Sequence, residues 1–384
     1  MSSSETIEIL RADSQDTLSP DECSTCLFDG TPQSGMIEEI STSDDTDSYR
    51  VIDEPIYGTI RIDLPCAIEI MELPTFQRLK KVLQHGITAL IGCVPSPAVN
   101  RFDHSVGAML LVKRTGGTEE AQLAALLHDV AHTTLSHVLD LVYGYVIHEV
   151  DKPEYIASTP ILEVLTRHGF DPERVLNEEN FRLLELPKPD LCADRLDYSL
   201  RDSVAFHILT REQARSILES AVNYEGQIVL NSIESASLLA NAYLSCDEYS
   251  WANPTHEYLY QLCAKAIRES LNDGHIDKAC LWKLGDEEFW SNLASRATPE
   301  VRSIMEKIDK RCKVSEWDES TMKSEADDNS VCELKLRVRT IDPLVLTEDG
   351  PQRLSCLDPD FAERREKYIK SRETVQKFVV KYTS

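Results

Sequence analysis

The 384-residue sequence lacks the features of a membrane or secreted protein. No apolar run approaches the ~20 residues that a bilayer-spanning helix needs, and the N-terminus lacks the charged and then apolar layout of a signal peptide. The 11 cysteines follow no framework of spacings, which is typical of a reducing compartment. The lone CxxC at Cys23 and Cys26 is interpreted as two free thiols. We therefore expect an intracellular protein of the cytoplasm or nucleus, with no membrane partner.

Positive charge is also scarce, because 40 Lys and Arg stand against 66 Asp and Glu and give a net charge of −26. A surface that coats nucleic acid needs clustered Lys and Arg, so we expect no nucleic-acid partner. A small anionic ligand in a locally basic pocket remains compatible with this charge. Residues 1–49 carry 12 acidic residues against one Arg, a net of −11, with few large apolar side chains. Residues 1–48 are therefore predicted to be a disordered acidic head.

Helical periodicity dominates the rest of the chain. The segment YRVIDEPIYGTIRI (49–62) alternates apolar and polar residues around Pro55 and Gly58 and predicts a hairpin. Helical patterns then continue to about residue 312. Residues 313–330 contain a run of acids and are predicted to be a linker or loop. Residues 331–384 predict a strand, CELKLRVRTIDPLVL, and a charged helix, DPDFAERREKYIKSRETVQKF, that pack on the core. The predicted fold is mainly α, a helical bundle at 49–312 with a helical extension and small β elements at the N- and C-terminal edges.

An adjacent His-Asp pair, His128 and Asp129, ends one of these helices. Thr118 is a plausible cap for this helix, which we expect to run from Glu119 to about Ala131, after an amphipathic helix at 104–114. Neighbouring residues on a helix point about 100° apart, so both side chains reach one ion only near a helix end. His104 upstream and Asp194 downstream complete a candidate set of four nitrogen and oxygen ligands for a divalent metal. Such an ion polarises a phosphoryl oxygen and lowers the pKa of water.

A second group of polar residues surrounds this set. His132, His137, Asp140, His148 and Glu149 follow the His-Asp pair closely, and imidazole beside carboxylate is typical of a general acid or base. Cations near the pair, Arg101, Lys188 and Arg195, could hold phosphate oxygens. Each of these residues alone is as compatible with a structural role. Five of the ten histidines within residues 101–149, however, favour a site.

Five segments resemble the HD-domain deoxynucleoside triphosphate triphosphohydrolases, a family that includes eukaryotic enzymes with a sterile-alpha-motif domain. They are DEPIYGTI, FQRLKKVLQHG, NRFDHSVG, LLHDVAHTTLSH and DRLDYSLRD, all within residues 50–210. The resemblance implies metal ligation by His104, His128, Asp129 and Asp194. It implies phosphate contacts from Arg101, His132, His137 and Arg195, a dyad of Asp140 and His148 that protonates the leaving oxygen, and sugar contacts from Gln84, Tyr198 and Asp202.

The sequence also departs from this family. Arg195 replaces a Lys, His85 replaces a Leu, and the stretch from Asp140 to His148 is shorter. Tyr258 and Leu262 stand where the family has side chains that contact phosphate or base. We therefore expect no sterile-alpha-motif domain before the helical core.

Three functions are compatible with these residues. The first is a metal-dependent phosphohydrolase that converts (deoxy)nucleoside triphosphates to nucleoside and triphosphate, with a nucleoside monophosphate or another phosphoester as the competing substrate. The second is a nucleotide-sensing protein of low activity. The third is a two-iron oxygenase, in which His132 and His148 would serve a second metal. Histidine and carboxylate ligands suit Fe, Mn, Zn or Ni, a nucleotide could bring Mg²⁺, and the resemblance admits a homo-oligomer.

Overall fold

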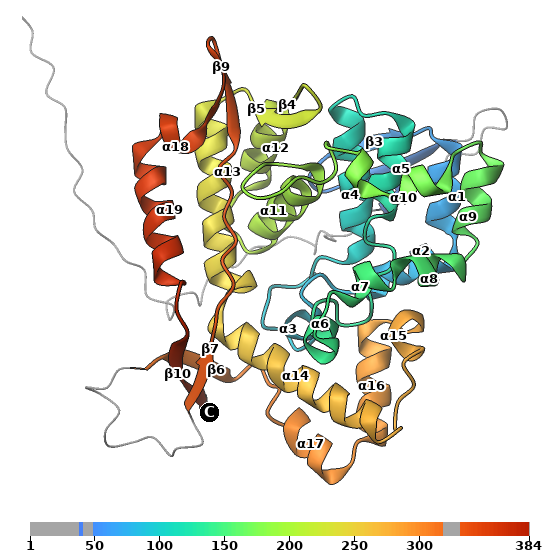
Figure 1. Ribbon diagram of the computed structural model, residues 1–384, viewed down its shortest axis with the longest axis vertical. Helices are drawn as coiled ribbons and strands as arrows, with labels where there is room; N and C mark the ends of the chain where they lie inside the picture. The colour runs from blue at the N-terminus through green and yellow to red at the C-terminus, as the bar shows by residue number, and fades with distance from the viewer. Residues whose placement is uncertain (1–37, 41–48, 318–330, 384) are drawn as a thin grey trace, which may run out of the picture. The chain divides into compact units, whose positions relative to one another are not determined.

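The computed structural model describes residues 38–40, 49–317 and 331–383, which belong to one compact unit that begins at residue 35. Figure 1 shows a mainly helical molecule. The α-helices are α1 (Pro65–Glu72), α2 (Pro74–Gln77), α3 (Gly86–Leu90), α4 (Arg101–Arg114), α5 (Glu119–Leu127), α6 (Val138–Tyr143), α7 (Ile147–Val150), α8 (Lys152–Ala157), α9 (Ile161–Arg167), α10 (Pro172–Leu176), α11 (Ala193–Ala205), α12 (Arg211–Ser220), α13 (Ile233–Cys246), α14 (Pro254–Asn272), α15 (Cys280–Lys283), α16 (Asp286–Arg296), α17 (Pro299–Met305), α18 (Leu354–Leu357) and α19 (Pro359–Ser371). Short 3₁₀ helices are η1 (Arg78–Lys81) and η2 (Glu178–Asn180), and η3 (Asp247–Trp251) is a π-helix.

Three small sheets lie at the edges of the helical core, as the sequence predicts. Their strand orders are β1-β2-β3, β6-β10-β7 and β4-β5-β8-β9. The strands are β1 (Glu38–Ile40), β2 (Arg50–Glu54), β3 (Gly58–Ile62), β4 (Ala221–Tyr224), β5 (Gln227–Leu230), β6 (Cys312–Glu316), β7 (Val331–Leu334), β8 (Leu344–Thr347), β9 (Gly350–Arg353) and β10 (Gln376–Tyr382). The antiparallel pair β2-β3 confirms the hairpin that the alternation at 49–62 predicts.

Two predicted irregular segments contain strands. β1 lies within the predicted acidic head and pairs antiparallel with β2. β6 occupies the first residues of the predicted linker and pairs with β10. The remainder of both segments, including Cys23 and Cys26, lies outside the described residues.

Helix α4 forms the centre of the core. It packs between α5 and α11, and every residue from Arg101 to Val112 is buried. The prediction of an amphipathic helix from residue 104 is therefore wrong. An amphipathic helix packs on the core along one face, whereas neighbouring helices cover α4 on all sides. Gly107 permits the contact with α11, since a Cβ atom there would lie 2.0 Å from Oδ1 of Asp197 and 2.2 Å from Nη2 of Arg201.

Helix α5 ends earlier than the sequence predicts. Thr118 caps its start by accepting a hydrogen bond from the backbone N–H of Ala121, as expected. The helix stops at Leu127 rather than near Ala131, and His128 is its C-cap residue. The adjacent His128 and Asp129 therefore lie at a helix end, which is where both can face one ion. His132 no longer shares a helix face with His128.

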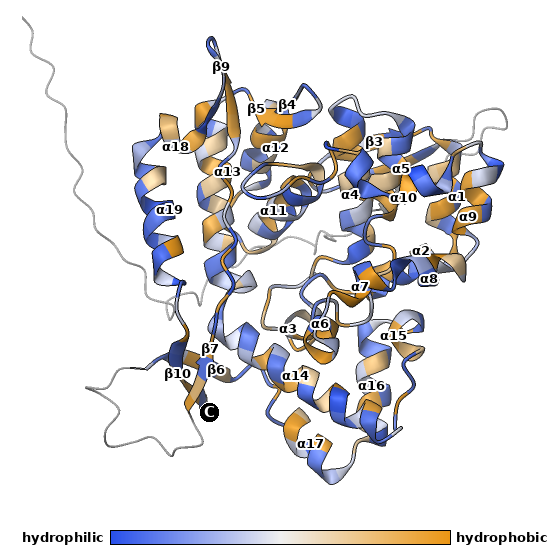
Figure 2. Ribbon diagram, viewed as in Figure 1, coloured by the Kyte–Doolittle hydropathy of each residue, from blue (hydrophilic) through white to orange (hydrophobic). Residues whose placement is uncertain are grey.

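The C-terminal part of the chain runs back over the core. After β7 the segment from residue 335 to 343 is extended and passes α13 on its way to β8 (Figure 1). Helix α19 ends at Ser371, and the last residues of the predicted helix form β10 instead. In Figure 2 hydrophobic and hydrophilic residues alternate along α14 and α19, as in helices with one face on the core. No helix among the described residues is long and apolar enough to span a membrane.

Replacing Gly107 by alanine should destabilise the protein and disturb the metal ligands. Inserting a methyl group between α4 and α11 is expected to lower the free energy of unfolding by about 1–3 kcal/mol, because Asp197 and Arg201 must move. The measurement is chemical unfolding of both proteins. The exposed substitution Gln261→Ala on α14 serves as the control and should change stability by less than about 0.5 kcal/mol. Equal stability of Gly107→Ala and wild type would contradict the close helix contact.

Candidate metal centre and active site

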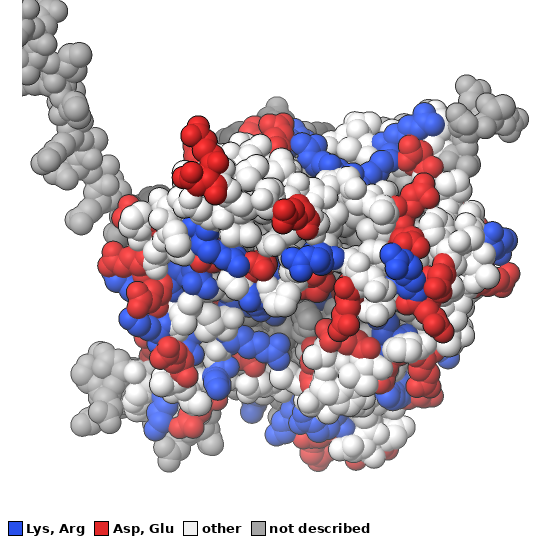
Figure 3. Space-filling model, turned by 45° about the horizontal axis from the view of Figure 1, so that its top comes forward, with Lys and Arg blue, Asp and Glu red and all other residues white. Residues whose placement is uncertain are grey.

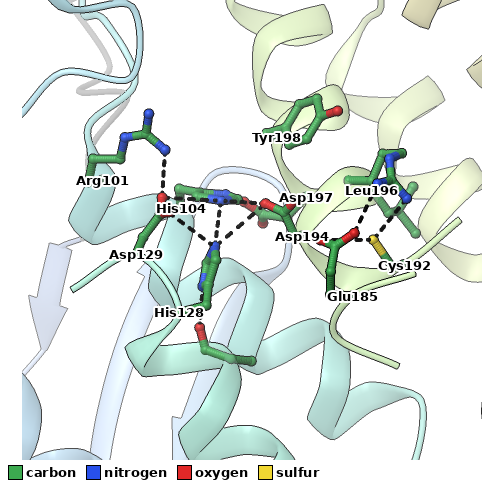
Figure 4. Close-up of polar contacts among 12 residues, drawn as sticks. Arg101, His104, His128, Asp129, Glu185, Cys192, Asp194, Leu196, Asp197 and Tyr198 are labelled. Carbon is green, nitrogen blue, oxygen red and sulfur yellow. Dashed lines mark hydrogen bonds and ion pairs between the residues drawn. The ribbon is translucent and has the colours of Figure 1, made fainter. Parts of the chain in front are cut away.

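Three of the four predicted metal ligands place donor atoms at one point (Figure 4). The atoms Nε2 of His104, Nε2 of His128 and one carboxylate oxygen of Asp194 all lie within 4.8 Å of one another. They come from α4, from the end of α5 and from the first turn of α11. Asp129, the fourth predicted ligand, has carboxylate oxygens 3.7 Å from each of the two imidazole Nε2 atoms. The structure thus brings together all four residues that the sequence singled out.

The orientation of the two imidazoles fits a bound cation. Nδ1 of His128 lies 2.7 Å from the carbonyl oxygen of Ala125, which can only accept, so Nδ1 carries the proton. Nδ1 of His104 lies 2.7 Å from Oδ2 of Asp197 and donates to that carboxylate in the same way. In the neutral rings both Nε2 atoms then carry lone pairs, and they are 3.2 Å apart. Two lone pairs and a carboxylate aimed at one point form a donor set for a divalent metal.

The residues behind His104 are buried and charged. Asp197 also accepts from Nε of Arg201 at 2.8 Å and from the hydroxyl of Tyr57 at 2.6 Å, and Arg201 donates to Glu54 at 2.5 Å. Burial alone lowers the pKa of His104, but its hydrogen bonds to Asp194 and Asp197 outweigh burial and raise the pKa to about 10. The protein therefore stabilises positive charge at the point where the donor atoms meet.

Arg101, the first residue of α4, has one hydrogen-bonding arm without a partner. Its Nη1 donates to Asp129 at 2.6 Å, and its Nε donates to Ser136 Oγ at 3.2 Å. The remaining nitrogen, Nη2, is buried and has no hydrogen-bond partner. A guanidinium held in this way presents a fixed N–H group beside the metal ligands, where a phosphoryl oxygen could accept.

Three histidines and Asp140 form a second cluster next to the metal ligands. The rings of His132 and His148 stack with centroids 3.7 Å apart. Asp140 lies 3.0 Å from Nδ1 of His137 and 3.5 Å from Nδ1 of His148. Asp140 therefore hydrogen bonds to His137, whereas Nδ1 of His148, the residue that the resemblance pairs with Asp140, has no hydrogen-bond partner. Burial lowers the pKa of His137 to about 4 despite Asp140, and burial with the charge of Arg101 holds the pKa of His132 well below its usual range.

A strained turn holds His137 in this cluster. Leu135 and Ser136 have φ angles of 56° and 48°, in the left-handed region that residues with side chains rarely adopt. Asp286 of α16 accepts from the backbone N–H of Leu135 at 2.7 Å, and Ser136 Oγ donates to Leu83 O at 2.7 Å. Gly86 lies against this turn, because a Cβ there would be 2.3 Å from the carbonyl oxygen of Leu135. These contacts offset the strain of the backbone.

One cavity of about 360 Å³ contains nearly the whole predicted site. Figure 3 shows basic and acidic side chains interleaved around a hollow on one face of the molecule. His104 and Asp140 are the predicted residues that stand behind the cavity wall, since neither lines it. The predicted residues that do line it are Gln84, Arg101, His128, Asp129, His132, His137, His148, Glu149, Asp194, Arg195, Tyr198 and Asp202.

Several predicted substrate contacts already have partners in the protein. Arg195 donates to Glu185 at 3.0 Å and to the carbonyl oxygens of Leu186 and Asp190. Asp202 is fully buried, and it accepts from Nε1 of Trp251 at 2.7 Å and lies 3.0 Å from Nε2 of His85.

The remaining predicted contacts differ in how far they are engaged. The hydroxyls of Tyr198 and Tyr243 hydrogen bond to each other. Gln84 keeps a buried Oε1 without a partner, and Glu149 is exposed at the edge of the cavity.

The cavity also contains residues that the sequence interpretation did not assign. Trp251 of η3 forms an edge-to-face contact with Tyr198, with centroids 5.2 Å apart. Arg337 and Arg339 enter from the extended segment after β7. The only sequence signal for these cations is the alternation KLRVR within the predicted strand. Tyr258 and Leu262 do not line the cavity and pack against hydrophobic clusters instead.

Comparison with known proteins places this site in a family. Residues 101–202 match the HD domain family. A metal-dependent phosphohydrolase of Cordyceps militaris is 36% identical over 338 residues, which cover 85% of this chain and 94% of the relative. An uncharacterized protein of Bacillus subtilis is 33% identical over 302 residues, or 78% of this chain and 89% of its own.

More distant similarities concern the fold or a part of the chain. The deoxynucleoside triphosphate triphosphohydrolase of Danio rerio is 31% identical over 157 residues, which cover 36% of this chain and 24% of that enzyme. A solved structure of an Aquifex aeolicus hypothetical protein superposes with a TM-score of 0.62 at 21% identity, over 90% of this chain and 96% of its own. A Bacteroides thetaiotaomicron phosphohydrolase gives 0.60 at 19% identity, over 87% and 99%.

Removing His128 should abolish metal binding. In His128→Ala the donor set loses one of two imidazoles, so we expect metal per chain, measured by mass spectrometry after dialysis, to fall at least about tenfold. The matched control is His275→Ala, because His275 is exposed and outside the site. Metal content in His128→Ala equal to that of the control would contradict the assignment. Two metals per wild-type chain would instead favour a second site at His132, His137 and His148, whose ring nitrogens also lie within 4.8 Å.

Acid should destabilise the protein through His256, a buried histidine at the cavity wall. Burial and the nearby His85 lower the pKa of His256 from 6.5 to about 4. Between these pH values the unfolded chain binds a proton that the folded chain does not, so this contribution to stability is lost as pH falls. The difference in free energy of unfolding between wild type and His256→Gln should change by up to about 1.4 kcal/mol per pH unit in this window. A difference that stays constant would contradict the burial of a neutral His256.

Proposed function

The chain belongs to the HD-domain metal-dependent phosphohydrolases, and we propose that within this family it hydrolyses (deoxy)nucleoside triphosphates to nucleoside and triphosphate. The observation that carries the proposal is the unpartnered Nη2 of Arg101 beside the converging His104, His128 and Asp194. A fixed N–H donor next to a divalent cation site is suited to a phosphate group. The partial similarity to deoxynucleoside triphosphate triphosphohydrolases supports the nucleotide.

The walls of the cavity support a nucleoside as the other half of the substrate. Tyr198 and Trp251 both line the cavity and form an aromatic wall close to the metal ligands. A base or sugar can pack against such a wall through dispersion. Gln84 offers a buried amide oxygen without a partner, which could accept from a hydroxyl group.

In the proposed reaction a water oxygen forms a bond to the α-phosphorus and the bond from phosphorus to the 5′ oxygen breaks. A divalent metal, when bound by His104, His128, Asp129 and Asp194, would lower the pKa of water and polarise a phosphoryl oxygen. Arg101 orients a phosphate oxygen through its free N–H group. His148 donates a proton to the departing 5′ oxygen, and the carboxylate of Asp140 lies 3.5 Å from its Nδ1. The products are a nucleoside and triphosphate.

A second candidate substrate is a nucleoside monophosphate or another simple phosphoester. The placement of Tyr258 and Leu262 outside the cavity favours it, because family members use those positions for phosphate or base contacts and this chain does not. The same metal ligands, Arg101 and His148 would serve this reaction, with orthophosphate as the product.

A hydrolysis screen tests the proposal. Protein loaded with Mn²⁺, Fe²⁺ or Zn²⁺ is incubated with deoxynucleoside tri-, di- and monophosphates, and the phosphate product is identified by ion chromatography. Release of triphosphate is the expected result. If the protein releases only orthophosphate, and only from monophosphates, its substrate is a phosphate monoester rather than a nucleoside triphosphate. Tight nucleotide binding without turnover at full metal occupancy would make the protein a nucleotide sensor.

His148→Ala should separate acid catalysis from metal binding. Loss of a general acid is expected to lower kcat by about 10²–10⁴, while the metal content stays at the wild-type value because His148 is not among the four ligands. His275→Ala again serves as the control. Wild-type turnover in His148→Ala would remove this residue from the mechanism.

A further inference from the structure

The extended segment after β7 presents cations on one face. Leu334 and Leu336 are buried in a hydrophobic cluster, and side chains of an extended chain alternate between two faces. Lys335, Arg337 and Arg339 therefore share the opposite face. Both arginines line the catalytic cavity, and all three line a hollow continuous with it.

The cations of this segment are available to a ligand, unlike Arg195, which the sequence highlighted. Arg195 is engaged by Glu185 and two carbonyl oxygens. Among the described residues, the guanidinium groups of Arg337 and Arg339 and the ammonium of Lys188 have no hydrogen-bond or salt-bridge partner. Two acids of the cavity are themselves paired, Glu185 with Arg195 and Glu178 with Lys152. The buried Asp247 attracts both Arg339 and Lys188 but forms no salt bridge with either. In a protein of net charge −26, unpaired cations at a cavity indicate an anionic ligand.

The backbone of Arg339 is fixed while its side chain faces the cavity. Its N–H donates to Oδ2 of Asp247 at 3.0 Å, and the hydroxyl of Tyr368 donates to the same oxygen at 2.7 Å. The charge of Arg339 contributes to lowering the pKa values of His137 and Lys188, after the larger effect of burial on each. Arg339 therefore acts electrostatically on the same space as the catalytic histidines.

The two hollows are joined at three residues. Lys188, Arg337 and Arg339 line both the catalytic cavity and the neighbouring hollow. A ligand that Arg101 holds next to the metal ligands can thus extend along the cavity and contact this row of cations. A single phosphate does not need this row, whereas a chain of phosphates carries several charges along its length.

We propose that Arg339 is a specificity-determining residue that, with Arg337 and Lys188, binds the distal phosphates of a polyphosphate substrate. This proposal rests on the proposed function, because it concerns the same cavity and selects a triphosphate over a monophosphate. The cations of this segment take the place of the basic side chains that Tyr258 and Leu262 do not supply.

Calorimetric binding of inorganic phosphates tests the proposal independently of turnover. The full chain, loaded with Mn²⁺ and again without metal, is titrated with tripolyphosphate and with orthophosphate. In Arg339→Gln we expect the affinity for tripolyphosphate to fall by about 10- to 100-fold, as for a lost charge-assisted hydrogen bond. Orthophosphate affinity should change less than about twofold. Arg302→Gln, at an exposed position on α17, is the matched control and should bind both ions like wild type.

Two further variants guard against loss of folding. Arg339→Lys keeps the charge and should recover part of the affinity for tripolyphosphate. If Arg339→Gln does not fold, Arg337→Gln replaces it and should also lower the affinity for tripolyphosphate. Equal affinity of wild type, Arg339→Gln and Arg337→Gln for tripolyphosphate would overturn the inference. A nucleotide screen without turnover, combined with tripolyphosphate binding that depends on Arg339, would reject the proposed function and leave this binding site standing.

Discussion

A line of buried charges connects the N-terminal hairpin with the metal ligands. Glu54 of β2 pairs with Arg201, Arg201 pairs with Asp197, and Asp197 fixes the ring of His104. Each ion in this line has an opposite charge within hydrogen-bonding distance, and an uncompensated charge at these depths costs several kcal/mol. The hairpin, α11 and α4 must therefore keep one arrangement. The position of His104 Nε2 is a consequence of that arrangement, so the ligand geometry is part of the fold.

The two histidine clusters lie side by side but are electrostatically opposite. His104 and His128 face Asp129 and Asp194, and the pKa values of both rings are raised. Burial and Arg101 lower the pKa values of His132 and His137, so those rings stay neutral. Adjacent groups with pKa values driven apart are typical of sites that divide chemical roles. Here one cluster favours positive charge, and the other keeps its rings neutral.

Local signals made the proximity of the four predicted ligands and most elements predictable. The rest depends on contacts between distant parts of the chain, which the sequence does not reveal. His128 and Asp129 could be placed at a helix end because their adjacency requires one, and Thr118 identified the start of that helix. The complete burial of α4 could not be predicted from the sequence, because it depends on α5 and α11, which cover its two sides. Trp251, Arg337 and Arg339 reach the cavity from later segments, and no spacing within residues 101–202 points to them. The hydrogen bonds of Arg195 likewise depend on the conformation of the loop at residues 185–190, which contains its partners.

The strained turn at Leu135 and Ser136 has a consequence for the order in which the site forms. Its anchor, Asp286, is about 150 residues further along the chain, and burial raises the pKa of that carboxyl to about 6 even though it accepts three hydrogen bonds. A growing polypeptide therefore contains all four predicted metal ligands before it has made the residue that holds the turn next to His137 in place. During synthesis the predicted metal-binding residues are therefore made first, and the anchor that completes the second histidine cluster is made afterwards.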